Sequence, residues 1–555
     1  MIRMTGAEIV VRALERQGVT HVAGIPGGAV LPIYDALCRS NTIRHVLARH
    51  EQGAGFIAQG MARASGRPGV CLASSGPGAT NLLTAIADAK LDSVPLVAIT
   101  GQVPRGMIGT DAFQEVDTFG LSMPITKHNF LVHSALELVR VLPLAFRIAA
   151  SGRPGPVLVD VPKDVQNEAA DVGVWPAAGG AAAPLEPDAA ALDRAAELID
   201  AAERPILYFG GGVVSSGAAE SAVALAERMQ APAVMTLMAL GVMPGAHPLS
   251  LGMLGMHGAR STNLALDRSD LLVAIGARFD DRATGKAAEF CPRAKIVHAD
   301  VDAAELGKIK TPDVAIVGDA GRVLRGLLER VGTRDRRGWL AAVAELKREH
   351  PLWRPGRDSL RQPYGLVEAV AGCLDEPVVV VTDVGQHQMW AAQAYPHSGP
   401  RAWLTSGGLG TMGFGLPAAI GAALAAPDRK VVCFTGDGSL LMNVQELATA
   451  AEEQVGVKIV LMDNGSLGLV HQQQSLFYGG RSYASKYRAS PDFVALAAAF
   501  GVRAIDLDRA ADPRRALAAA LAAPGPGLVH ASIDVEEKVF PMVPPGAGNL
   551  EMIGG

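Results

Sequence analysis

Aromatic residues, cysteines and long apolar runs are all scarce in this 555-residue sequence. Aromatic residues make up only 5% of the chain and its lysines and arginines are dispersed, so we expect no stacking platform or basic patch for nucleic acid. The five cysteines are odd in number and never spaced as Cys-x-x-Cys, which argues against disulfides and structural zinc. No stretch reaches the roughly 20 apolar residues of a membrane span, and the N-terminus lacks the apolar core of a signal peptide. We therefore expect a cytoplasmic protein without nucleic-acid or membrane partners.

The length of the chain and the position of its proline-, glycine- and charge-rich stretches predict three domains. Strands that run into glycine-rich or polar turns and then into helices recur throughout, which is typical of α/β domains with doubly wound parallel sheets. A stretch rich in proline, alanine and glycine precedes residue 188, and a charged stretch with several prolines covers 332–363. We expect the charged stretch to form a solvated connecting face. The predicted domains are 1–165, 188–335 and 364–545.

The most informative stretch is 429–466, where two apolar runs enclose a segment with helical spacing, as in a β-α-β unit. Asp437 follows the first predicted strand and Asn464 follows the second, so both lie where open α/β sheets bind ligands. Their oxygens and a nearby loop carbonyl suit Mg²⁺ bound with a diphosphate, and Gly436 and Gly438 would let phosphates approach the backbone. Gly-Asp-Gly alone is a common turn. Its pairing with an asparagine at the next strand end makes the pattern specific.

Four predicted strands of the first domain also end in glycine or polar residues, so one rim of that sheet is suited to holding a ligand. Glu51 stands between a strand and a helix, with small residues after it. One interpretation is a helix-start carboxylate favoured by the helix dipole. The other is a carboxyl group that exchanges a proton with a cofactor.

The second domain carries Gly210–Gly212 and Gly276 at strand ends, followed by Asp300 at a later strand end. This order resembles a dinucleotide-binding arrangement without matching Gly-x-Gly-x-x-Gly strictly. Tight turns in an ordinary α/β layer explain it equally well.

Long segments in the correct order give the chain a resemblance to the acetohydroxyacid synthase (acetolactate synthase) catalytic subunits, most closely the bacterial isozyme II type. The segments include GIPGGAVLPIYDAL, RHEQGA, SSGPGATNLLTAIADA, IGTDAFQEVD, LGMLGMHG, GARFDDR, TDVGQHQMWAAQ, GLGTMGFGLPAA and GDGSLLMNVQEL. The resemblance implies three domains of the type found in thiamin-diphosphate (ThDP) dependent pyruvate oxidases and decarboxylases. It also implies ThDP, Mg²⁺ and FAD as cofactors, with pyruvate and 2-oxobutyrate as substrates. The enzyme would make 2-acetolactate, and from 2-oxobutyrate 2-aceto-2-hydroxybutyrate, for branched-chain amino acid synthesis.

In that family the aminopyrimidine and diphosphate sites come from different protomers, so a homodimer or homotetramer is expected, with a possible small regulatory subunit. The resemblance gives Glu51 the role of activating the cofactor, and places Gly28, Phe113, Gln114 and Lys163 along the reaction pocket. The metal would be held by Asp437, Asn464 and the main-chain carbonyl of Ser466. Segments that match ThDP-binding segments contribute Gly410, Met412, Gly436, Gly438 and Ser439. Segments that match FAD-contacting segments contribute Gly210, Gly211, Gly212, Thr236, Leu237, Gly276, Arg278, Asp280, Arg282, Asp300 and Asp319.

Two of these residues have plainer interpretations. Met412 would support the bent cofactor, but without the resemblance it reads as a core methionine at the start of an apolar helix. Arg278 matches the residue that selects the second 2-oxoacid, since a guanidinium can hold a carboxylate with two hydrogen bonds. The alternative is a surface ion pair with Asp280 or Asp281.

One departure affects the expected substrate range. The family commonly has a tryptophan where this chain has Gln473, and that indole packs the extra methyl group of 2-oxobutyrate and belongs to the herbicide site. We expect weaker preference for 2-oxobutyrate and poorer binding of sulfonylurea-type inhibitors.

Two alternative functions remain from the sequence. A pyruvate oxidase or decarboxylase would use the same ThDP site, and a non-catalytic nucleotide-binding or assembly subunit is an alternative from another class. Glu51, Asp437 and Asn464 are all present, which argues against that last alternative.

Overall fold

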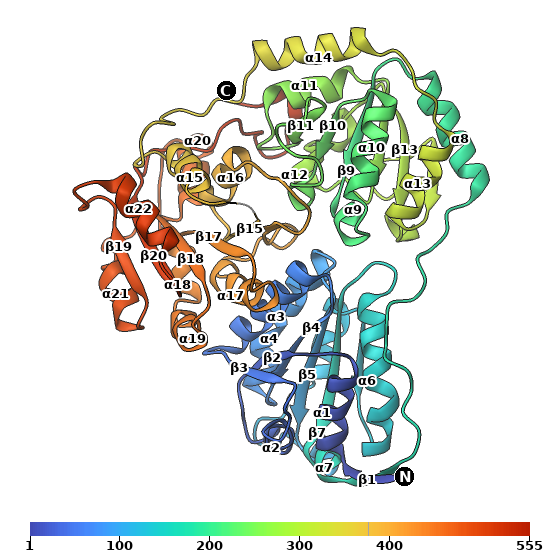
Figure 1. Ribbon diagram of the computed structural model, residues 1–555, viewed down its shortest axis with the longest axis vertical. Helices are drawn as coiled ribbons and strands as arrows, with labels where there is room; N and C mark the ends of the chain where they lie inside the picture. The colour runs from blue at the N-terminus through green and yellow to red at the C-terminus, as the bar shows by residue number, and fades with distance from the viewer. Residues whose placement is uncertain (376, 555) are drawn as a thin grey trace.

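The computed structural model describes residues 1–375 and 377–554, which form three α/β units with a six-stranded parallel sheet each (Figure 1). The first unit lies at the bottom of Figure 1, the central unit at the top and the third at the left. The prediction of three doubly wound parallel-sheet domains is confirmed.

The first and third sheets have the same strand order when the strands of each are numbered from its own first strand. The first sheet is ordered β3-β2-β4-β5-β7-β6 and the third β16-β15-β17-β18-β20-β19, and both reduce to 2-1-3-4-6-5. The central strands of both sheets are apolar runs that are buried except for Lys430 at the start of β17, as expected for strands covered by helices on both faces. The strands are β2 (His21–Gly24), β3 (Arg44–Leu47), β4 (Gly69–Ala73), β5 (Leu96–Gln102), β6 (His128–Leu131), β7 (Pro156–Pro162), β15 (Val378–Thr382), β16 (Trp403–Leu404), β17 (Lys430–Gly436), β18 (Val457–Asp463), β19 (Arg503–Asp506) and β20 (Gly527–Ser532).

The helices of these two domains begin after strand ends, often at a side chain that caps the first turn. For example, α3 begins after His50, whose ring accepts the Gln52 N–H, and ends at Gly66 with a φ of 75°. The first domain contains α1 (Gly6–Arg16), α2 (Leu31–Leu37), α3 (Glu51–Ser65), α4 (Pro77–Leu91), α5 (Thr118–Ser122), α6 (Ala135–Ala150) and α7 (Lys163–Asn167). The third contains α15 (Pro363–Gly372), α16 (Gln386–Ala394), α17 (Gly415–Ala425), α18 (Asp437–Met442), α19 (Glu446–Glu453), α20 (Gly468–Phe477), α21 (Phe493–Ala499) and α22 (Pro513–Ala522).

The central sheet is ordered β11-β10-β9-β12-β13-β14, which reduces to 3-2-1-4-5-6, the order of dinucleotide-binding folds. Its strands are β9 (Pro205–Phe209), β10 (Ala233–Met235), β11 (Ser250–Met253), β12 (Leu271–Ile275), β13 (Lys295–Asp300) and β14 (Val314–Val317). Its helices are α8 (Ala189–Ala201), α9 (Gly211–Ser215), α10 (Ala219–Met229), α11 (Arg260–Arg268), α12 (Asp281–Thr284), α13 (Ala320–Arg330) and α14 (Arg337–Glu349).

Two segments differ from what their composition predicts. Strand β8 (Ala169–Val172) lies beyond residue 165 and pairs antiparallel with β1 (Ile2–Thr5), so the first unit extends to Val172. The charged stretch expected to be a solvated connection keeps most of its basic side chains exposed, but it contains α14. Its Trp339 is 6% exposed and donates a hydrogen bond to the Pro205 carbonyl at 3.1 Å. Trp339, Val343 and Leu346 are buried together and pack this helix against the central domain.

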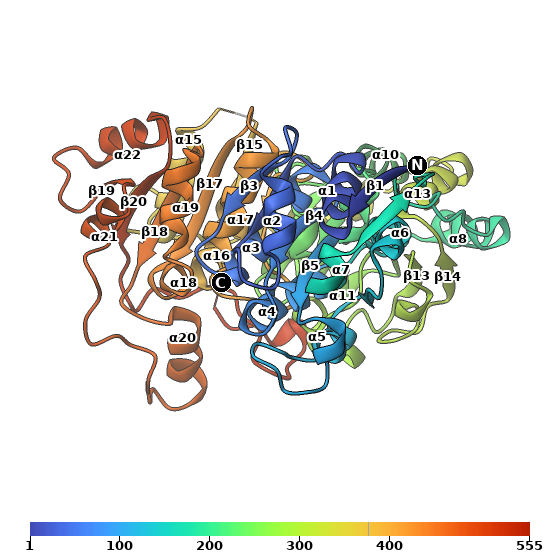
Figure 2. The ribbon, with the colours of Figure 1, turned by 90° about the horizontal axis from the view of Figure 1, so that it is seen from below.

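The two related domains are in direct contact through α3 and α17, which lie side by side in Figures 1 and 2. A Cβ on Gly60 would lie 2.0 Å from the Ala418 carbonyl oxygen, and one on Gly421 would lie 1.9 Å from that of Ile57. The helices therefore approach so closely that only glycine fits at these two positions.

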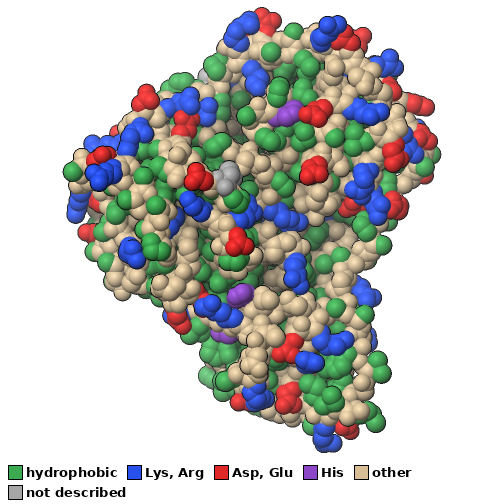
Figure 3. Space-filling model, in the orientation of Figure 1, with side chains coloured by type: hydrophobic (Ala, Val, Ile, Leu, Met, Phe, Trp, Pro, Cys, Tyr) green, Lys and Arg blue, Asp and Glu red, His purple; other side chains and the backbone are tan. Residues whose placement is uncertain are grey.

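The molecular surface carries both signs of charge. Lysine and arginine are interspersed with aspartate and glutamate over the face shown in Figure 3, in keeping with the net charge of −5.

No helix among the described residues combines the length and apolar character needed to cross a bilayer. The C-terminal segment returns to the central domain, where the Lys286 N–H donates to the Ala547 carbonyl at 3.0 Å.

Candidate active site

The three predicted metal-binding residues lie together at the ends of β17 and β18, which are neighbouring strands. Asp437 Oδ2 and Asn464 Oδ1 accept the same hydrogen, the Ser466 N–H, at 3.1 and 3.2 Å. Asn464 Oδ1 also accepts the Ser466 hydroxyl at 3.0 Å. The structure thus assembles a carboxylate, an amide oxygen and a serine backbone from segments 29 residues apart. Their role as metal ligands stays a prediction.

The electrostatics of Asp437 fit a divalent cation. Asp437 is 2% exposed, and burial, followed by the charge of Asp463, raises its pKa to about 7. Within residues 1–375 and 377–554, no lysine or arginine pairs with it. A bound cation would supply the missing positive charge, and oxygen donors of these types are the ones that Mg²⁺ prefers.

Gly436 and Gly438 are required by close approaches to other residues of the site. A Cβ on Gly436 would lie 2.9 Å from His387 Nδ1, and one on Gly438 would lie 2.5 Å from the Tyr487 hydroxyl oxygen. The His387 ring is buried, its pKa is lowered to about 3 by burial, and its Nε2 has no partner among the described residues. A neutral, unpaired ring nitrogen beside a glycine turn fits a polar ligand such as a diphosphate.

His387 and its neighbour Gln386 were not predicted from the sequence. Gln386 Oε1 accepts the Asn464 side-chain amide at 3.0 Å. Both follow Gly385 after β15, at the same edge of the sheet as Asp437. That strand-end position was the signal that could have identified them. The predicted Ser439 is buried and donates to the Val384 carbonyl at 2.8 Å, which ties α18 to the same turn.

Met412 lies next to this site, not in the core. It precedes α17 and is partly exposed, and a Cβ on Gly438 would lie 3.6 Å from its methyl carbon. The interpretation of Met412 as a core residue is therefore wrong. Gly410, two residues earlier, has a φ of 68°, a left-handed conformation that favours glycine.

Glu51 is the first residue of α3, where the helix dipole favours a negative charge. Its Oε2 accepts a hydrogen bond from the Asn81 side-chain amide of α4 at 2.9 Å. The two backbone N–H groups before it, of Arg49 and His50, donate to Glu446 Oε1 of the third domain at 3.0 and 3.1 Å. Neither Asn81 nor Glu446 was predicted, since their partners are distant in sequence. The helix-start interpretation and the proton-exchange interpretation are both compatible with this position.

Phe113 and Gln114 lie on an exposed loop of the first domain. Phe113 is 86% exposed, and Gln114 has a φ of 60°. The loop is wrapped around the Glu115 carboxylate, which accepts the N–H groups of Thr110 at 3.2 Å and Ala112 at 3.0 Å. The other predicted pocket residues are on the same rim, with Gly28 exposed after β2 and Lys163 partly exposed after β7.

The central domain places its glycines at the point where the strand order reverses. Gly210–Gly212 follow β9 and Gly276 follows the adjacent β12, and a Cβ on Gly210 would lie 2.0 Å from the Gly276 carbonyl oxygen. The packing of the two turns by itself explains these glycines. Thr236, which immediately precedes Leu237, has a buried hydroxyl oxygen without a partner among the described residues, which fits a polar ligand.

The acidic residues predicted to contact FAD have structural contacts. Asp280 accepts the Ala283 N–H at the start of α12, and Asp319 accepts the Arg322 N–H at the start of α13. Asp300 ends β13 and accepts the Asp302 N–H at 2.9 Å, and burial raises its pKa to about 6. Their part in binding a flavin stays a prediction.

Arg278 is not held by the acidic residues that follow it. The Asp281 carboxylate pairs with Arg282 at 3.9 Å, and within the described chain Arg278 forms no ion pair with Asp280 or Asp281. The surface ion pair expected as the alternative is therefore wrong, and the Arg278 guanidinium is available for another anion.

Comparison with known proteins agrees with this geometry. Three thiamine pyrophosphate enzyme profiles match the chain, namely the N-terminal TPP binding domain over 4–121, the central domain over 192–327 and the C-terminal TPP binding domain over 383–531. The acetolactate synthase isozyme 1 large subunit of Escherichia coli (strain K12) is 61% identical over 553 residues, covering 100% of this chain and 98% of that protein. The chain belongs to the acetolactate synthase large-subunit family.

Other acetolactate synthase large subunits are similar over the whole chain. The isozyme 2 large subunit of the same organism is 49% identical over 560 residues, covering 99% of both chains. The large subunit of Corynebacterium glutamicum is 49% identical over 566 residues, covering 99% of this chain and 90% of that protein. Since the identity to isozyme 1 is higher than that to isozyme 2, the expected isozyme II type is not confirmed. The acetolactate synthase family and its dependence on ThDP are confirmed.

Proposed function

We propose that this chain is the catalytic subunit of an acetolactate synthase, which decarboxylates pyruvate and transfers the two-carbon unit to a second 2-oxoacid. The observation that carries the proposal is the convergence of Asp437, Asn464 and Ser466 on one hydrogen-bonded cluster at the ends of β17 and β18. The cluster would hold Mg²⁺ and the diphosphate of ThDP. Bound ThDP supplies the carbon nucleophile and the electron sink that decarboxylation of a 2-oxoacid needs.

The chain's own groups would position the reactants and move protons. Glu51 would exchange a proton with N1′ of the aminopyrimidine, and Asn81 would hold its carboxyl group in place. Gly28, Phe113, Gln114 and Lys163 would line the pocket. Arg278 would hold the carboxylate of the acceptor, which its freedom from Asp280 and Asp281 supports. FAD would bind the central domain as a structural cofactor, because formation of acetolactate involves no net redox change.

The exposed Phe113 supports a homodimer as the smallest active assembly, since a large apolar side chain on a pocket-lining loop is suited to cover by a second copy. A homotetramer is compatible with the same surface. The relatives are named large subunits, which supports a small regulatory subunit as a further partner. Branched-chain amino acid synthesis in the cytoplasm is the setting that fits this activity.

The acceptor preference is the finer part of the proposal. Gln473 lies exposed on α20 at the position where the family commonly has tryptophan. We expect Gln473→Trp to raise the preference for 2-oxobutyrate over pyruvate by about tenfold, since one methylene group contributes about 1–3 kcal/mol of discrimination. Competition assays with both 2-oxoacids measure the product ratio. An unchanged ratio in Gln473→Trp, together with strong native preference for 2-oxobutyrate, would contradict this part.

The test of the main proposal is a product assay on the purified protein with ThDP, Mg²⁺, FAD and pyruvate, with and without equimolar 2-oxobutyrate. We expect 2-acetolactate as the main product and a loss of about 100-fold or more in Glu51→Gln. Glu197→Gln, on the exposed face of α8, is the matched control and should keep full activity. Acetaldehyde as the product would indicate a decarboxylase, and acetate with oxygen uptake would indicate an oxidase.

A further inference from the structure

A buried ionic cluster joins the first domain to the third. Arg63 of α3 donates from Nη2 to Asp88 of α4 at 3.1 Å and to Asp92, just after α4, at 2.8 Å. All three side chains are nearly inaccessible, so the cluster holds two negative charges and one positive charge away from water. Burial, followed by the charge of Asp92, raises the pKa of Asp88 to about 6. A cluster of this composition is a weak source of stability, because removing the charges from water costs about as much as their attraction returns.

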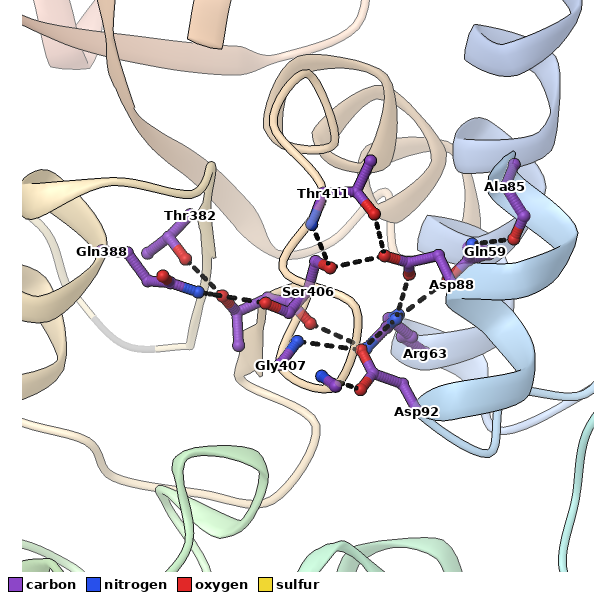
Figure 4. Close-up of polar contacts among 12 residues, drawn as sticks. Gln59, Arg63, Ala85, Asp88, Asp92, Thr382, Gln388, Ser406, Gly407 and Thr411 are labelled. Carbon is purple, nitrogen blue, oxygen red and sulfur yellow. Dashed lines mark hydrogen bonds and ion pairs between the residues drawn. The ribbon is translucent and has the colours of Figure 1, made fainter. Parts of the chain in front are cut away.

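Apart from a bond from Arg63 Nη2 to Gln59 Oε1 within α3 at 2.9 Å, the other side-chain bonds of the cluster go to one loop of the third domain, residues 405–412 between β16 and α17 (Figure 4). Asp92 accepts the N–H groups of Gly407 at 3.0 Å and Gly408 at 2.7 Å. Asp88 Oδ2 accepts the Thr411 hydroxyl at 2.8 Å and the Ser406 hydroxyl. These contacts cross more than 300 positions of sequence.

The same loop is fixed from two further sides. Arg63 donates from Nη1 to the Thr405 carbonyl at 2.8 Å, at the start of the loop. Just beyond its end, the Gly413 N–H donates to the buried Asp383 at 2.8 Å. A Cβ on Gly407 would lie 2.4 Å from the sulfur of Met238, so the central domain also packs against the loop. The loop is therefore held at a junction of all three domains.

The segment between these attachments carries the groups that face the proposed cofactor. Gly410 and Met412 belong to it, and Met412 lies against Gly438 of the diphosphate turn. Met412 is partly exposed, whereas the carboxylates of Asp88, Asp92 and Asp383 that hold the segment from either side are buried. Rigid support behind an exposed contact surface is the arrangement that keeps binding groups in place.

We infer that Asp88 and Asp92 are positioning residues, which hold the Gly410–Met412 segment in the geometry that binds ThDP. The inference rests on the proposed function in taking ThDP as the ligand of this segment. Two carboxylates of the first domain would thus affect ThDP binding in the third domain indirectly, by holding the loop that contacts the cofactor.

The experiment compares variants by calorimetric titration of cofactor-free protein with ThDP in the presence of Mg²⁺. Asp92→Asn leaves one side-chain oxygen where two are needed, so it cannot accept from Arg63, Gly407 and Gly408 together. We expect ThDP to bind roughly tenfold to 100-fold more weakly, the usual effect of removing a group that orients a ligand-binding group. KM for pyruvate measured at saturating ThDP should change little.

The matched control is Glu305→Gln, which removes another buried carboxylate from an ion pair between domains. Glu305 is 6% exposed and pairs with Arg153 of the first domain at 2.6 Å, away from the loop. Thermal unfolding of both variants measures the loss of stability separately. If Asp92→Asn weakens ThDP binding no more than Glu305→Gln does, the cluster only joins the domains and the inference is wrong.

A milder variant keeps the test decisive if Asp92→Asn fails to fold. Thr411→Val removes one hydroxyl that donates to Asp88 and leaves both charges in place, so weaker ThDP binding is expected at nearly native stability. Unchanged binding in this variant would contradict the role of Asp88. If the wild-type protein binds ThDP but makes no acetolactate, the proposed function fails while the inference stands. If it does not bind ThDP, both fail.

Discussion

The first and third domains have the same strand order but place different chemistry at corresponding strand ends. In the third domain, β17 and β18 end at Asp437 and Asn464, which share the Ser466 N–H. In the first domain, the corresponding strands are β4 and β5, which end at small residues near Ser74 and at Gln102. Gln102 donates to the buried Asp160 at 3.1 Å and to the Val116 carbonyl at 2.9 Å. The difference shows that the scaffold fixes where a site can lie, and the strand-end residues determine what the site does.

The largest effect should follow from removing the charged group at the third domain's strand end. We expect Asp437→Asn to weaken ThDP binding in Mg²⁺ by more than about 100-fold, because a side chain proposed to bind the metal directly contributes more than the groups that orient it. Ser74→Ala is the counterpart in the first domain. Its buried hydroxyl has no partner among the described residues, so its loss removes no hydrogen bond within the protein and should weaken binding by no more than about tenfold, the value of one neutral hydrogen bond. Calorimetric titration measures both, and equal losses would refute the contrast between the domains.

The next effect concerns Glu51, the residue of the first domain that we propose as the proton-exchanging acid. Asn81→Leu removes a side-chain amide that bonds to Glu51 and should lower kcat by about tenfold to 100-fold, since a hydrogen bond to a charged group contributes about 1.5–3 kcal/mol. ThDP affinity should be retained, because the diphosphate cluster lies in the other domain. Thr80→Ala, one residue earlier on α4 and exposed, is the control. A large loss of ThDP affinity in Asn81→Leu would show that the first domain also contributes to binding the cofactor, contrary to this prediction.

The contact between the corresponding helices α3 and α17 gives a prediction about stability. Gly421→Ala places a methyl group 1.9 Å from the Ile57 carbonyl oxygen and should lower the free energy of unfolding by about 1–3 kcal/mol. Gly372→Ala, where a Cβ would meet nothing within 4 Å, should be neutral or slightly stabilising. Urea unfolding of both variants provides the measurement. Equal stabilities would mean that the helices separate at little cost.

The last prediction concerns the pH dependence of stability and a buried carboxyl group of the first domain. Burial raises the pKa of Asp160 to about 7, while its bonds to Thr100 and Gln102 oppose the shift. In the unfolded chain the group titrates near the usual value of about 3.9. The folded state therefore binds more protons between these values, and its stability decreases as pH rises from about 4 to about 7.

Asp160→Asn should remove that decrease, so its stability should depend less on pH in this window than that of the wild type. Asp171→Asn, on the exposed β8 position, should leave the pH dependence unchanged. The free energy of unfolding measured at several pH values distinguishes the two. A steeper slope in Asp160→Asn would reverse the assigned sign.

The sequence was most informative where a function depends on one short segment. The stretch 429–466 forms β17 and β18 as predicted, with Asp437 and Asn464 at their ends. The helical segment between them is divided into α18 and α19, because Asn443 leaves helical conformation and donates to the Gly413 carbonyl at 2.7 Å. That contact joins distant segments, and local periodicity contains no information about it.

The parts that could not be predicted are those in which partners are far apart in sequence. Arg63, Asp88 and Asp92 look like ordinary surface charges on helices until the third domain's loop is placed over them. Glu446 is likewise unremarkable in sequence, although it holds the backbone before Glu51. Only the arrangement of the domains brings these residues into contact with the segments that carry the predicted site residues.

The packing of α3 against α17 also bears on how this chain arose. The two helices hold corresponding positions in two sheets of identical order, and each presents a glycine to the backbone of the other. This is the self-complementary contact that two copies of a single domain would make in a symmetric dimer. Duplication of an ancestral one-domain gene would turn that contact into an internal one. Because the contact lies away from the connection between the copies, a dinucleotide-type domain could then be inserted there without disturbing it.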